Sequence, residues 1–527
     1  MPRITAKPKG VVAAGHRHTA GAAAKIIKAG GNAFDAALAA QFAACVVEPV
    51  FTSLGGGGFL LAHTAGGRDA VYDFFTQTPL HSPPADALDF YPVYADFGTV
   101  TQEFHIGMGA IATPGIIKGL FKVHAELGTL PMARIVEPAV ELARRGVRMN
   151  RLQAYSFTVV QPILQSTSEA FALHSSPRHP ERLLAEGEVL KQPLLADTLE
   201  ALAREGERLF YRGEIAQRIV RDCRERGGTL SADDLRAYRV IKRRPLAFRY
   251  HDYRVLTNPP PSSGGVLIAL ALKLLEQVDL HAMRFGSAEY LALLARTMEA
   301  VDRARAERVD PHVAGSAVTA RALLSTELLQ SYQRTVSEHR LHQRGTTHIS
   351  VIDAKGNLAS VTTSNGEGCG HMVPDTGIML NNMLGEEDIN PLGFHQGAPG
   401  RRLSSMLSPT LIFAADGSRF ATGSGGSNRI RTAMLQVLLN LMAFHVSVRT
   451  AVARPRIHFE KGLLSVESGF SATDLRRLAR WFPKRKVWRE RNLFFGGVHT
   501  AGYDAGDKRF HGAGDLRRGG ACIKVIA

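Results

Sequence analysis

Cysteine is scarce in this sequence: there are four among 527 residues, and no two are spaced as Cys-x-x-Cys. Such scattered cysteines form neither a zinc signature nor a dense disulfide framework. The 20 histidines show no metal-ligand spacing either. The run Gly55–Gly58 lacks the Gly-Lys-Ser/Thr that completes a phosphate-binding loop. We therefore expect neither a metal ion nor another cofactor.

Long apolar runs are also missing, and no stretch of eighteen apolar residues occurs. A transmembrane helix needs about 20 such residues, so the sequence indicates no membrane span and no membrane partner. The first residues contain no sustained apolar segment of the kind found in a secretory signal. We therefore expect a cytoplasmic protein by default, with a periplasmic or secreted location left open.

Acidic residues are too few to balance the basic ones, which leaves a formal net charge of +16. A basic excess of this kind raises the question of a nucleic-acid partner. The two main basic clusters, near residue 241 and over 476–491, belong to no zinc finger, RNA-recognition motif or basic region followed by heptads. We interpret them as solvated surface and expect no nucleic acid.

What the sequence does contain is a mixture of helical and strand-like segments in a chain long enough for a large core. The N-terminal third alternates short apolar strands with Ala-rich helices, among them a pair over 19–49 broken at Gly30-Gly31. After residue 346 the pattern changes to strands and glycine-rich turns, and a helix follows over 428–445. No internal repeat and no low-complexity linker marks a domain boundary.

One junction in this pattern has two interpretations. The segment GTTHISVID places Gly345 and two threonines at the start of an alternating strand. Threonine is a good strand residue and glycine often ends a loop, so the segment can be purely structural. Alternatively, cleavage of the Gly345–Thr346 bond would give Thr346 a free α-amine, the base that its hydroxyl needs to become a nucleophile. A residue without Cβ at 345 would tolerate the strained backbone that such a cleavage requires.

The strand after Thr346 has a predicted partner. HISVID and LASVTTS both alternate, and AKGN between them indicates a tight turn. An antiparallel hairpin that pairs Asp353 with Asn357 puts Thr346 opposite Ser364. A shift of one residue would put a neighbour of Ser364 there instead. In each register a hydroxyl or amide group lies beside Thr346.

Two further segments carry groups suited to acyl-transfer chemistry. RRLSSMLSPT presents adjacent hydroxyls at Ser404 and Ser405, and TGSGGSNRIR presents Gly425-Gly426 at the start of a helix. Backbone N–H groups in a glycine turn at a helix N-terminus are suited to stabilise an oxyanion. A polar turn and an ordinary helix start are the structural alternatives. The proximity of these features to Thr346 in the sequence favours a catalytic interpretation.

Taken in order, these pieces resemble the γ-glutamyltransferase (γ-glutamyl transpeptidase) family of N-terminal-nucleophile hydrolases. The resemblance covers nearly the whole chain and runs through AGGNAFDAALAA, GGGGF, PGIIKGL, NPPPSSGG, GTTHISVIDAKGN, GIMLNNM, RRLSSMLSPT, TGSGGSNRI and GAGDLRRGG. It implies an α+β fold, a four-layer αββα sandwich in which two antiparallel sheets lie between helical layers. It also implies a precursor that cleaves itself into a large segment, 1–345, and a small segment, 346–527. The two would stay interlocked in one unit, and such units could form a dimer.

The resemblance also assigns roles to individual residues. The nucleophile would be Thr346, released by cleavage after Gly345, with Ser364 holding its hydroxyl. Gly425 and Gly426 would form the oxyanion hole. The substrate-binding residues would be Asn365, Glu386, Ser404, Ser405 and Phe75. The assignment of Asn365 assumes a one-residue gap against the family pattern.

The departures from the family concern the substrate pocket. Members that act on glutathione usually have an Arg where YDFFTQTP places Phe75, and an aromatic ring cannot replace a bidentate Arg–carboxylate pair. Glu386 stands where Asp is usual, and Met383 where Gln or Glu is common. The segment leading to Arg401 is shorter than the loop of the lidded members. The reaction machinery thus matches the family, whereas the altered pocket puts glutathione in doubt as the substrate.

We therefore expect an enzyme that cleaves γ-glutamyl or related amide bonds through an acyl-Thr346 intermediate and passes the acyl group to water or an amine. An acylase for glutaryl-type or masked γ-glutamyl amides, with little glutathione activity, is the alternative within this class. An unprocessed binding protein that retains the fold is the alternative of another class.

Overall fold

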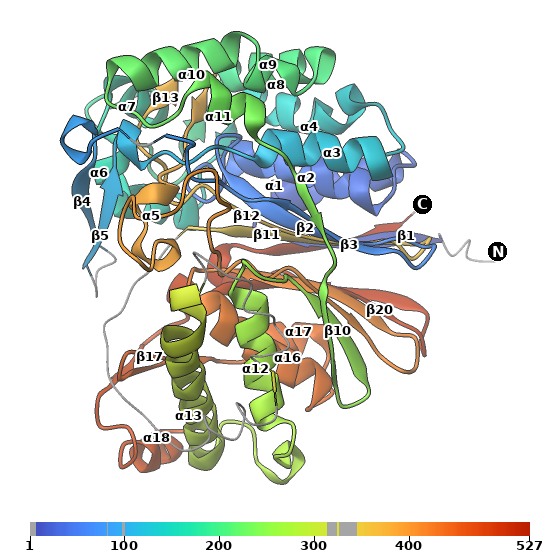
Figure 1. Ribbon diagram of the computed structural model, residues 1–527. Coiled ribbons are helices and arrows are strands. Elements are labelled where there is room, and N and C mark those ends of the chain that lie inside the picture. Colours follow the sequence, from blue (N-terminus) through green and yellow to red (C-terminus); the bar gives the residue numbers. More distant parts are fainter. Residues whose placement is uncertain (1–6, 82, 97–100, 313–323, 326–344, 527) are drawn as a thin grey trace.

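The computed structural model describes residues 7–81, 83–96, 101–312, 324–325 and 345–526. Strands from both ends of the chain form a seven-stranded antiparallel sheet near its centre (Figure 1). Its strand order is β22 (Ala521–Ile526), β1 (Pro8–Ala14), β11 (Thr347–Asp353), β12 (Leu358–Ser364), β2 (Gly57–His63), β3 (Asp69–Phe74) and β8 (Ile241–Arg243). The strand that begins directly after Thr346 is thus an interior strand of this sheet.

A second antiparallel sheet, of six strands, lies against the first (Figure 1). Its strand order is β21 (Arg509–Ala513), β20 (Gly497–Asp504), β16 (Arg419–Gly425), β15 (Thr410–Phe413), β10 (Tyr253–Thr257) and β9 (Leu246–Tyr250). β11 packs against β16 and β20, so the start of β11 is enclosed between the two sheets.

Helices cover the outer face of each sheet (Figure 1). Those on the side of the seven-stranded sheet are α1 (Arg17–Lys28), α2 (Ala33–Val47), α3 (Ile116–Leu127), α4 (Met132–Arg145), α8 (Pro193–Glu205), α9 (Arg208–Tyr211), α10 (Glu214–Glu225) and α11 (Ala232–Ala237). Those on the side of the six-stranded sheet are α12 (Gly264–Leu275), α13 (Ala288–Ala304), α16 (Arg429–Met442), α17 (Val448–Ala453) and α18 (Ala472–Leu478).

Smaller elements complete the described chain. Three short helices follow one another in the chain, namely α5 (Arg151–Val159), α6 (Gln161–Leu164) and α7 (Ser168–His174). The remaining strands form small sheets, namely β4 (Tyr91–Asp96) with β5 (Thr101–Ile106), β6 (Val147–Arg148) with β7 (Val189–Leu190), β13 (Met372–Val373) with β14 (Ile378–Met379), and β17 (Ile457–Glu460) with β18 (Leu463–Val466) and β19 (Arg485–Val487).

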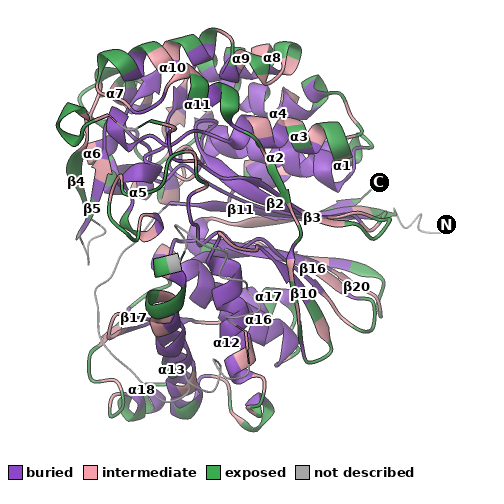
Figure 2. Ribbon diagram, viewed as in Figure 1, coloured by how far each residue is buried: buried purple, intermediate pink, exposed green. Residues whose placement is uncertain are grey.

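The two faces of the seven-stranded sheet belong to different hydrophobic clusters. Successive side chains of a strand point to opposite faces. In β11, Ile349 and Val351 accordingly pack toward the cluster that contains α1 to α4, whereas Ile352 packs toward the cluster that contains the six-stranded sheet, α12 and α16. Both faces of β11 are buried, as Figure 2 shows for the centre of the molecule.

The predicted helix pair broken at Gly30-Gly31 is confirmed as α1 and α2. Gly30 has a φ of +95°, a conformation that favours glycine. α2 then begins with a capping box, in which the Asn32 side chain accepts from the N–H of Asp35 and the Asp35 side chain accepts from the N–H of Asn32. Alanine lets every residue of α2 be buried close to its neighbours.

Among the described residues, no helix has both the length and the apolar character needed to cross a membrane.

Candidate active site

The β11–β12 hairpin has the predicted register. The Asp353 N–H donates to the Asn357 carbonyl over 3.1 Å, and Thr347 lies opposite Thr363. Continuing this register by one residue places Thr346 opposite Ser364. The positive φ of Gly356, +90°, closes the turn between the strands.

Two hydroxyl groups meet at the carbonyl oxygen of Gly345. The Thr346 Oγ1 donates to it over 2.6 Å, and the Ser364 Oγ donates to it over 2.8 Å. Thr346 is only 3% exposed. Two donors on one carbonyl oxygen polarise its C=O bond and stabilise the negative charge that develops there when a nucleophile attacks the carbon.

Gly345 is held by its neighbours rather than by an unusual backbone conformation. Its N–H donates to the Glu367 Oε1 over 2.6 Å. A Cβ at this position would lie 2.8 Å from the Gly366 carbonyl oxygen, too close for a normal contact. Its φ lies outside the positive range. Gly345 was expected to tolerate a strained backbone, whereas the described structure shows a steric reason for glycine: a side chain would collide with the Gly366 carbonyl.

Arg518 contacts Thr346 from the six-stranded side and is not among the site residues predicted from the sequence. Its Nη1 donates to the Thr346 carbonyl over 3.0 Å, and its guanidinium lies 5.1 Å from the centre of the Phe51 ring. Burial lowers the pKa of Arg518 to about 10, against the attraction of Asp515, Glu48 and other carboxylates. Arg518 thus stays charged at neutral pH. The motif GAGDLRRGG contained the only sequence signal for it.

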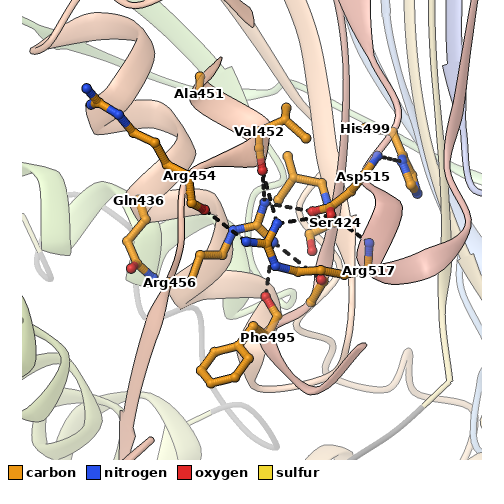
Figure 3. A network of polar contacts seen from close by, with 12 residues as sticks. Ser424, Gln436, Ala451, Val452, Arg454, Arg456, Phe495, His499, Asp515 and Arg517 are labelled. Atoms are coloured by element: carbon orange, nitrogen blue, oxygen red, sulfur yellow. Dashed lines mark hydrogen bonds and ion pairs between the residues drawn. The ribbon is translucent and has the colours of Figure 1, made fainter. Parts of the chain in front are cut away.

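A buried ion network fixes the turn that carries Arg518 (Figure 3). Asp515 caps the 3-10 turn η9 (Leu516–Arg518) and accepts from the Val498 N–H over 3.0 Å. It also forms ion pairs with Arg456, at 2.7 Å, and with Arg517, at 3.1 Å. Arg517 in turn makes a bidentate contact with Glu467. Charged groups that are buried and paired in this way are costly to displace.

Glu48 binds the hydroxyl of Thr347, the second of the two neighbouring threonines. Its Oε2 accepts from Thr347 Oγ1 over 2.8 Å, and its Oε1 accepts from Thr19 Oγ1 over 2.7 Å. Burial raises the pKa of Glu48, while these two hydrogen bonds and Arg518 oppose the shift. The Thr347 hydroxyl is therefore occupied by Glu48, and of the two neighbouring threonines only Thr346 bonds to the Gly345 carbonyl.

His348 is not placed to serve as a base. Its Nδ1 is 2.8 Å from Thr362 Oγ1, and its Nε2 is 2.9 Å from Ser350 Oγ. Complete burial lowers the pKa of His348 well below its usual value, with a further contribution from His499. The imidazole is thus neutral at physiological pH, and both of its nitrogens are engaged on the face of β11 toward the second sheet.

The glycine pair at the end of β16 lies against Thr346. A Cβ on Gly425 would overlap the Thr346 carbonyl oxygen. Gly426 has a φ of +129°, and α16 begins three residues later. The predicted glycine turn before a helix is therefore present, and Gly425 approaches Thr346 closely because it has no side chain.

Asn365 and Glu386 come together next to Ser364. The Asn365 Nδ2 reaches the Leu380 carbonyl at 3.5 Å, whereas its buried Oδ1 has no hydrogen-bond partner among the described residues. Gly366 follows with a φ of +64°, and a Cβ there would overlap the Glu386 Oε1. The end of β12 therefore brings one of the predicted amide groups and the predicted acidic group to the same place.

Ser404 and Ser405 are buried and bond to nearby backbone. The Ser404 Oγ donates to the Pro261 carbonyl over 3.3 Å, and the Ser405 Oγ accepts from the Leu407 N–H over 3.0 Å. The Ser405 carbonyl accepts from the Ser263 N–H over 2.9 Å. In the described structure, neither hydroxyl bonds to Thr346.

Phe75 packs in the core instead of lining an open pocket. It is 2% exposed, and its ring stacks on Phe59 at a centroid distance of 5.4 Å. Arg402 donates to the Phe75 carbonyl, lies 3.2 Å from Asp73 and sits over the Tyr238 ring. The nearby guanidinium of Arg402 is thus engaged by the protein itself.

Comparison with known proteins shows the family of this chain. A family model for gamma-glutamyltranspeptidase matches residues 19–525. The Acylase ACY 1 proenzyme of Pseudomonas sp. (strain V22) is 33% identical over 486 residues, covering 87% of this chain and 84% of the relative. The chain therefore belongs to the gamma-glutamyltranspeptidase family.

Two further proteins are similar to this chain. The Glutathione hydrolase proenzyme of Escherichia coli (strain K12) is 32% identical over 481 residues, covering 86% of this chain and 82% of the relative. The crystal structure of cephalosporin acylase from Bacillus halodurans superimposes with a TM-score of 0.85 at 24% identity, covering 99% of this chain and 97% of that one. The last comparison shows a shared mixed fold of helices and antiparallel sheets.

Proposed function

We propose that this chain is a self-processing amide hydrolase and acyltransferase of the gamma-glutamyltranspeptidase type. The observation that carries the proposal is the convergence of the Thr346 and Ser364 hydroxyls on the Gly345 carbonyl oxygen. Membership of the family supports it, as do relatives whose names describe them as proenzymes. In the proposed enzyme, two sheets and two helical layers form one four-layer αββα unit shared by the segments 1–345 and 346–527.

Self-cleavage would begin with attack of the Thr346 Oγ on the Gly345 carbonyl carbon. A C–O bond forms, the C–N bond to Thr346 breaks, and the proton of the hydroxyl ends on the nitrogen. Ser364 donates to the carbonyl oxygen while negative charge develops on it. Water then hydrolyses the ester, which leaves a carboxylate on Gly345 and a free α-amine on Thr346.

Turnover would reuse the same atoms. The α-amine of Thr346, with an unperturbed pKa near 7.7–8.0, takes the proton of its own hydroxyl as the oxygen attacks the substrate amide. We assign the N–H groups of Gly425 and Gly426 to the resulting oxyanion, because this turn lies directly against Thr346. Water or an amine then takes the acyl group from Thr346.

Arg518 would act as a positioning residue. After cleavage Thr346 is a chain terminus, held by β11 on one side only. The hydrogen bond from Arg518 to the Thr346 carbonyl would keep this terminus in place, and the ion network around Asp515 would keep Arg518 in place. A buried charge-assisted hydrogen bond is suited to this purpose because it is strong and directional.

For the acyl donor, we propose substrates whose α-carboxylate is absent or masked, such as glutaryl-type or substituted γ-glutamyl amides. Phe75 supplies no charge, and Arg402 is occupied by Asp73 and the Phe75 carbonyl. A free α-carboxylate would then meet only the neutral hydroxyls of Ser404 and Ser405. Asn365 and Glu386, near the end of β12, would bind a substrate amine or amide.

Denaturing gels and N-terminal sequencing of the purified protein test the proposal. We expect two fragments, the smaller of which begins Thr346-Thr347-His348. A chain that stays intact after long incubation would contradict self-processing and favour the alternative of a binding protein that retains the fold.

A further inference from the structure

A cavity of about 630 Å³ is lined in part by residues that closely follow candidate active-site residues in the sequence. One wall is the end of α13 with the π-helical turn η4 (Arg305–Val309). The other walls are the segment 387–394, which begins with the 3-10 turn η7 (Glu387–Ile389), and the end of β17. Volumes of about 300–1,000 Å³ are typical of small-molecule sites. The walls come from both sides of residue 345, so in a cleaved protein the two fragments would share the cavity.

The cavity is connected to the proposed catalytic residues through its lining. Asn428, in the lining, lies two residues after Gly426, and Glu387 follows Glu386 directly. The Ser427 Oγ donates to the Asp388 Oδ2 over 2.8 Å, which joins the glycine turn to the opposite wall. A ligand in the cavity would therefore lie beside the turn that touches Thr346.

The charge of the cavity is opposite to that of the protein. Seven of its lining residues are Asp or Glu and three are Arg or Lys, whereas the whole chain has a net charge of +16. Most of these carboxylates have a basic neighbour: Asp302 and Glu460 lie beside Arg431. Asp310 lies 3.1 Å from Arg305, and Glu307 lies 3.7 Å from Arg303. The excess of acidic groups nevertheless makes the cavity selective for cations.

Glu299 is the second observation that points to a ligand. Its side chain lines the cavity, and the residue is only 6% exposed. Among the described residues its carboxylate has no hydrogen-bond or ion-pair partner; Arg296 and Arg303 attract it only at longer range. Burial, together with Asp302, raises the pKa of Glu299 to about 7. The charged form of a buried carboxylate without a partner is unfavourable, so the group either takes up a proton or pairs with a cation.

We propose that this cavity binds a small aliphatic amine with two or more amino groups, anchored through one ammonium group at Glu299, as the acceptor of the acyl group on Thr346. This rests on the proposed acyltransferase function. One ammonium group pairs with Glu299 while a second, neutral amino group attacks the acyl carbon. A C–N bond forms, the ester bond to the Thr346 Oγ breaks, and the proton of the amine returns to that oxygen.

Isothermal titration calorimetry with 1,5-diaminopentane tests the site directly. Wild type should bind the diamine, and 1,5-pentanediol, which has the same length and no charge, should bind at least tenfold more weakly. The nearly isosteric Glu299→Gln should weaken diamine binding about tenfold or more, the typical effect of losing one charged hydrogen bond. Glu387→Gln, an exposed residue on the opposite wall, should weaken it in the same direction.

The matched control is Glu186→Gln, which removes the same charge from an exposed position outside the cavity. It should leave diamine binding unchanged. Equal weakening by Glu186→Gln would show a general charge effect and overturn the proposal. So would diol binding as tight as diamine binding, or unchanged binding in both cavity variants.

Acyl transfer supplies the second measurement. With a fixed acyl donor, Glu299→Gln should raise the KM for 1,5-diaminopentane as acceptor about tenfold. If the diamine binds but its KM as acceptor does not change, the acceptor assignment is overturned. If wild type neither cleaves itself nor hydrolyses any donor, the proposed function fails, whereas the calorimetric result still decides whether the cavity binds cations.

Discussion

The polar groups of the cleavage site and of the predicted substrate pocket have different partners in the intact chain. On the cleavage side, Thr346 and Ser364 both bond to the carbonyl oxygen of Gly345. On the side of the predicted substrate pocket, Ser404 and Ser405 bond to backbone groups of their own surroundings. In the intact chain the cleavage-side hydroxyls are thus directed at the Gly345 carbonyl, whereas the two serines of the predicted substrate pocket are engaged with neighbouring backbone.

The largest effect should come from the oxygen on the cleavage side. Thr346→Ala should abolish self-cleavage, because it removes the hydroxyl that is proposed to attack the Gly345 carbonyl carbon. Thr347→Ala should retain substantial cleavage, since its hydroxyl bonds to Glu48. Gel analysis of both variants over several hours distinguishes them. If Thr346→Ala were cleaved and Thr347→Ala stayed intact, the nucleophile would be Thr347 instead of Thr346.

Ser364→Ala should slow self-cleavage about 10²–10³-fold, the typical cost of removing one oxyanion donor. Ser360→Ala is the matched control: it lies on the same strand and is buried, but its hydroxyl donates to the Thr422 carbonyl. Rates are measured by following the appearance of the small fragment. If both variants cleave at equal rates, the Ser364 hydroxyl does not act on the scissile carbonyl.

The enzyme's preference among acyl donors should depend on whether the donor carries a charged α-carboxylate. A γ-glutamyl donor that lacks a charge-assisted partner for its α-carboxylate should lose about 2–3 kcal/mol of binding, roughly a hundredfold in kcat/KM. We therefore expect wild type to hydrolyse glutaryl-p-nitroanilide better than γ-glutamyl-p-nitroanilide. A strong preference for the γ-glutamyl donor would mean that a basic group reaches its carboxylate. Phe75→Arg is a poor test, because it would bury a charge in the core.

Arg518→Met should lower kcat about tenfold or more, since it removes a charged hydrogen bond to Thr346. Arg518→Lys keeps the charge and should recover part of the loss. Pre-cleaved protein, with its Tm measured in parallel, separates this effect from slow processing and from unfolding. A fall in Tm with unchanged kcat would assign Arg518 to the stability of the ion network alone.

The smallest effect concerns Glu299 and pH. Burial raises the pKa of Glu299 in the folded state from its ordinary value of 4.5 to about 7. Between these values the folded state binds more protons than the unfolded state, so its contribution to stability decreases as the pH rises from about 4.5 to about 7. Urea unfolding at pH 5 and pH 8 should show Glu299→Gln gaining stability relative to wild type at the higher pH. An unchanged difference between the two proteins would contradict the shifted pKa.

The local part of the site could be predicted from the sequence. The hairpin register depends on alternation and on one turn, both of which are visible between residues 346 and 364, and it is confirmed. The glycine turn before α16 could be read in the same way. Glu48 and Arg518 could not, because they lie about 300 and 170 residues from Thr346 in the sequence and reach it only through tertiary packing. The roles of the predicted site residues stay predictions.

The core could be predicted only in outline. The helix pair at Gly30-Gly31 followed from alanine content and a glycine break. The burial of Phe75 could not be predicted from the sequence, because an aromatic residue that follows a strand can lie either in a pocket or in the core. Its stacking on Phe59 depends on the neighbouring strand β2. Likewise, the sequence contains Asp515 and Arg517, but it does not show that they are buried and paired with each other.

The strand order of the seven-stranded sheet has a consequence for the life of the protein after processing. β1, from before residue 345, lies between β22 and β11, which both come from after it. Once the chain is cut, the two fragments are interleaved in one sheet and cannot separate without breaking the hydrogen bonds on both edges of β1. Folding is unimolecular before the cut and bimolecular after it, so a processed molecule that unfolds loses the high effective concentration of its two halves. Processing would therefore give Thr346 a free amino terminus, but it would also make refolding of the protein less efficient.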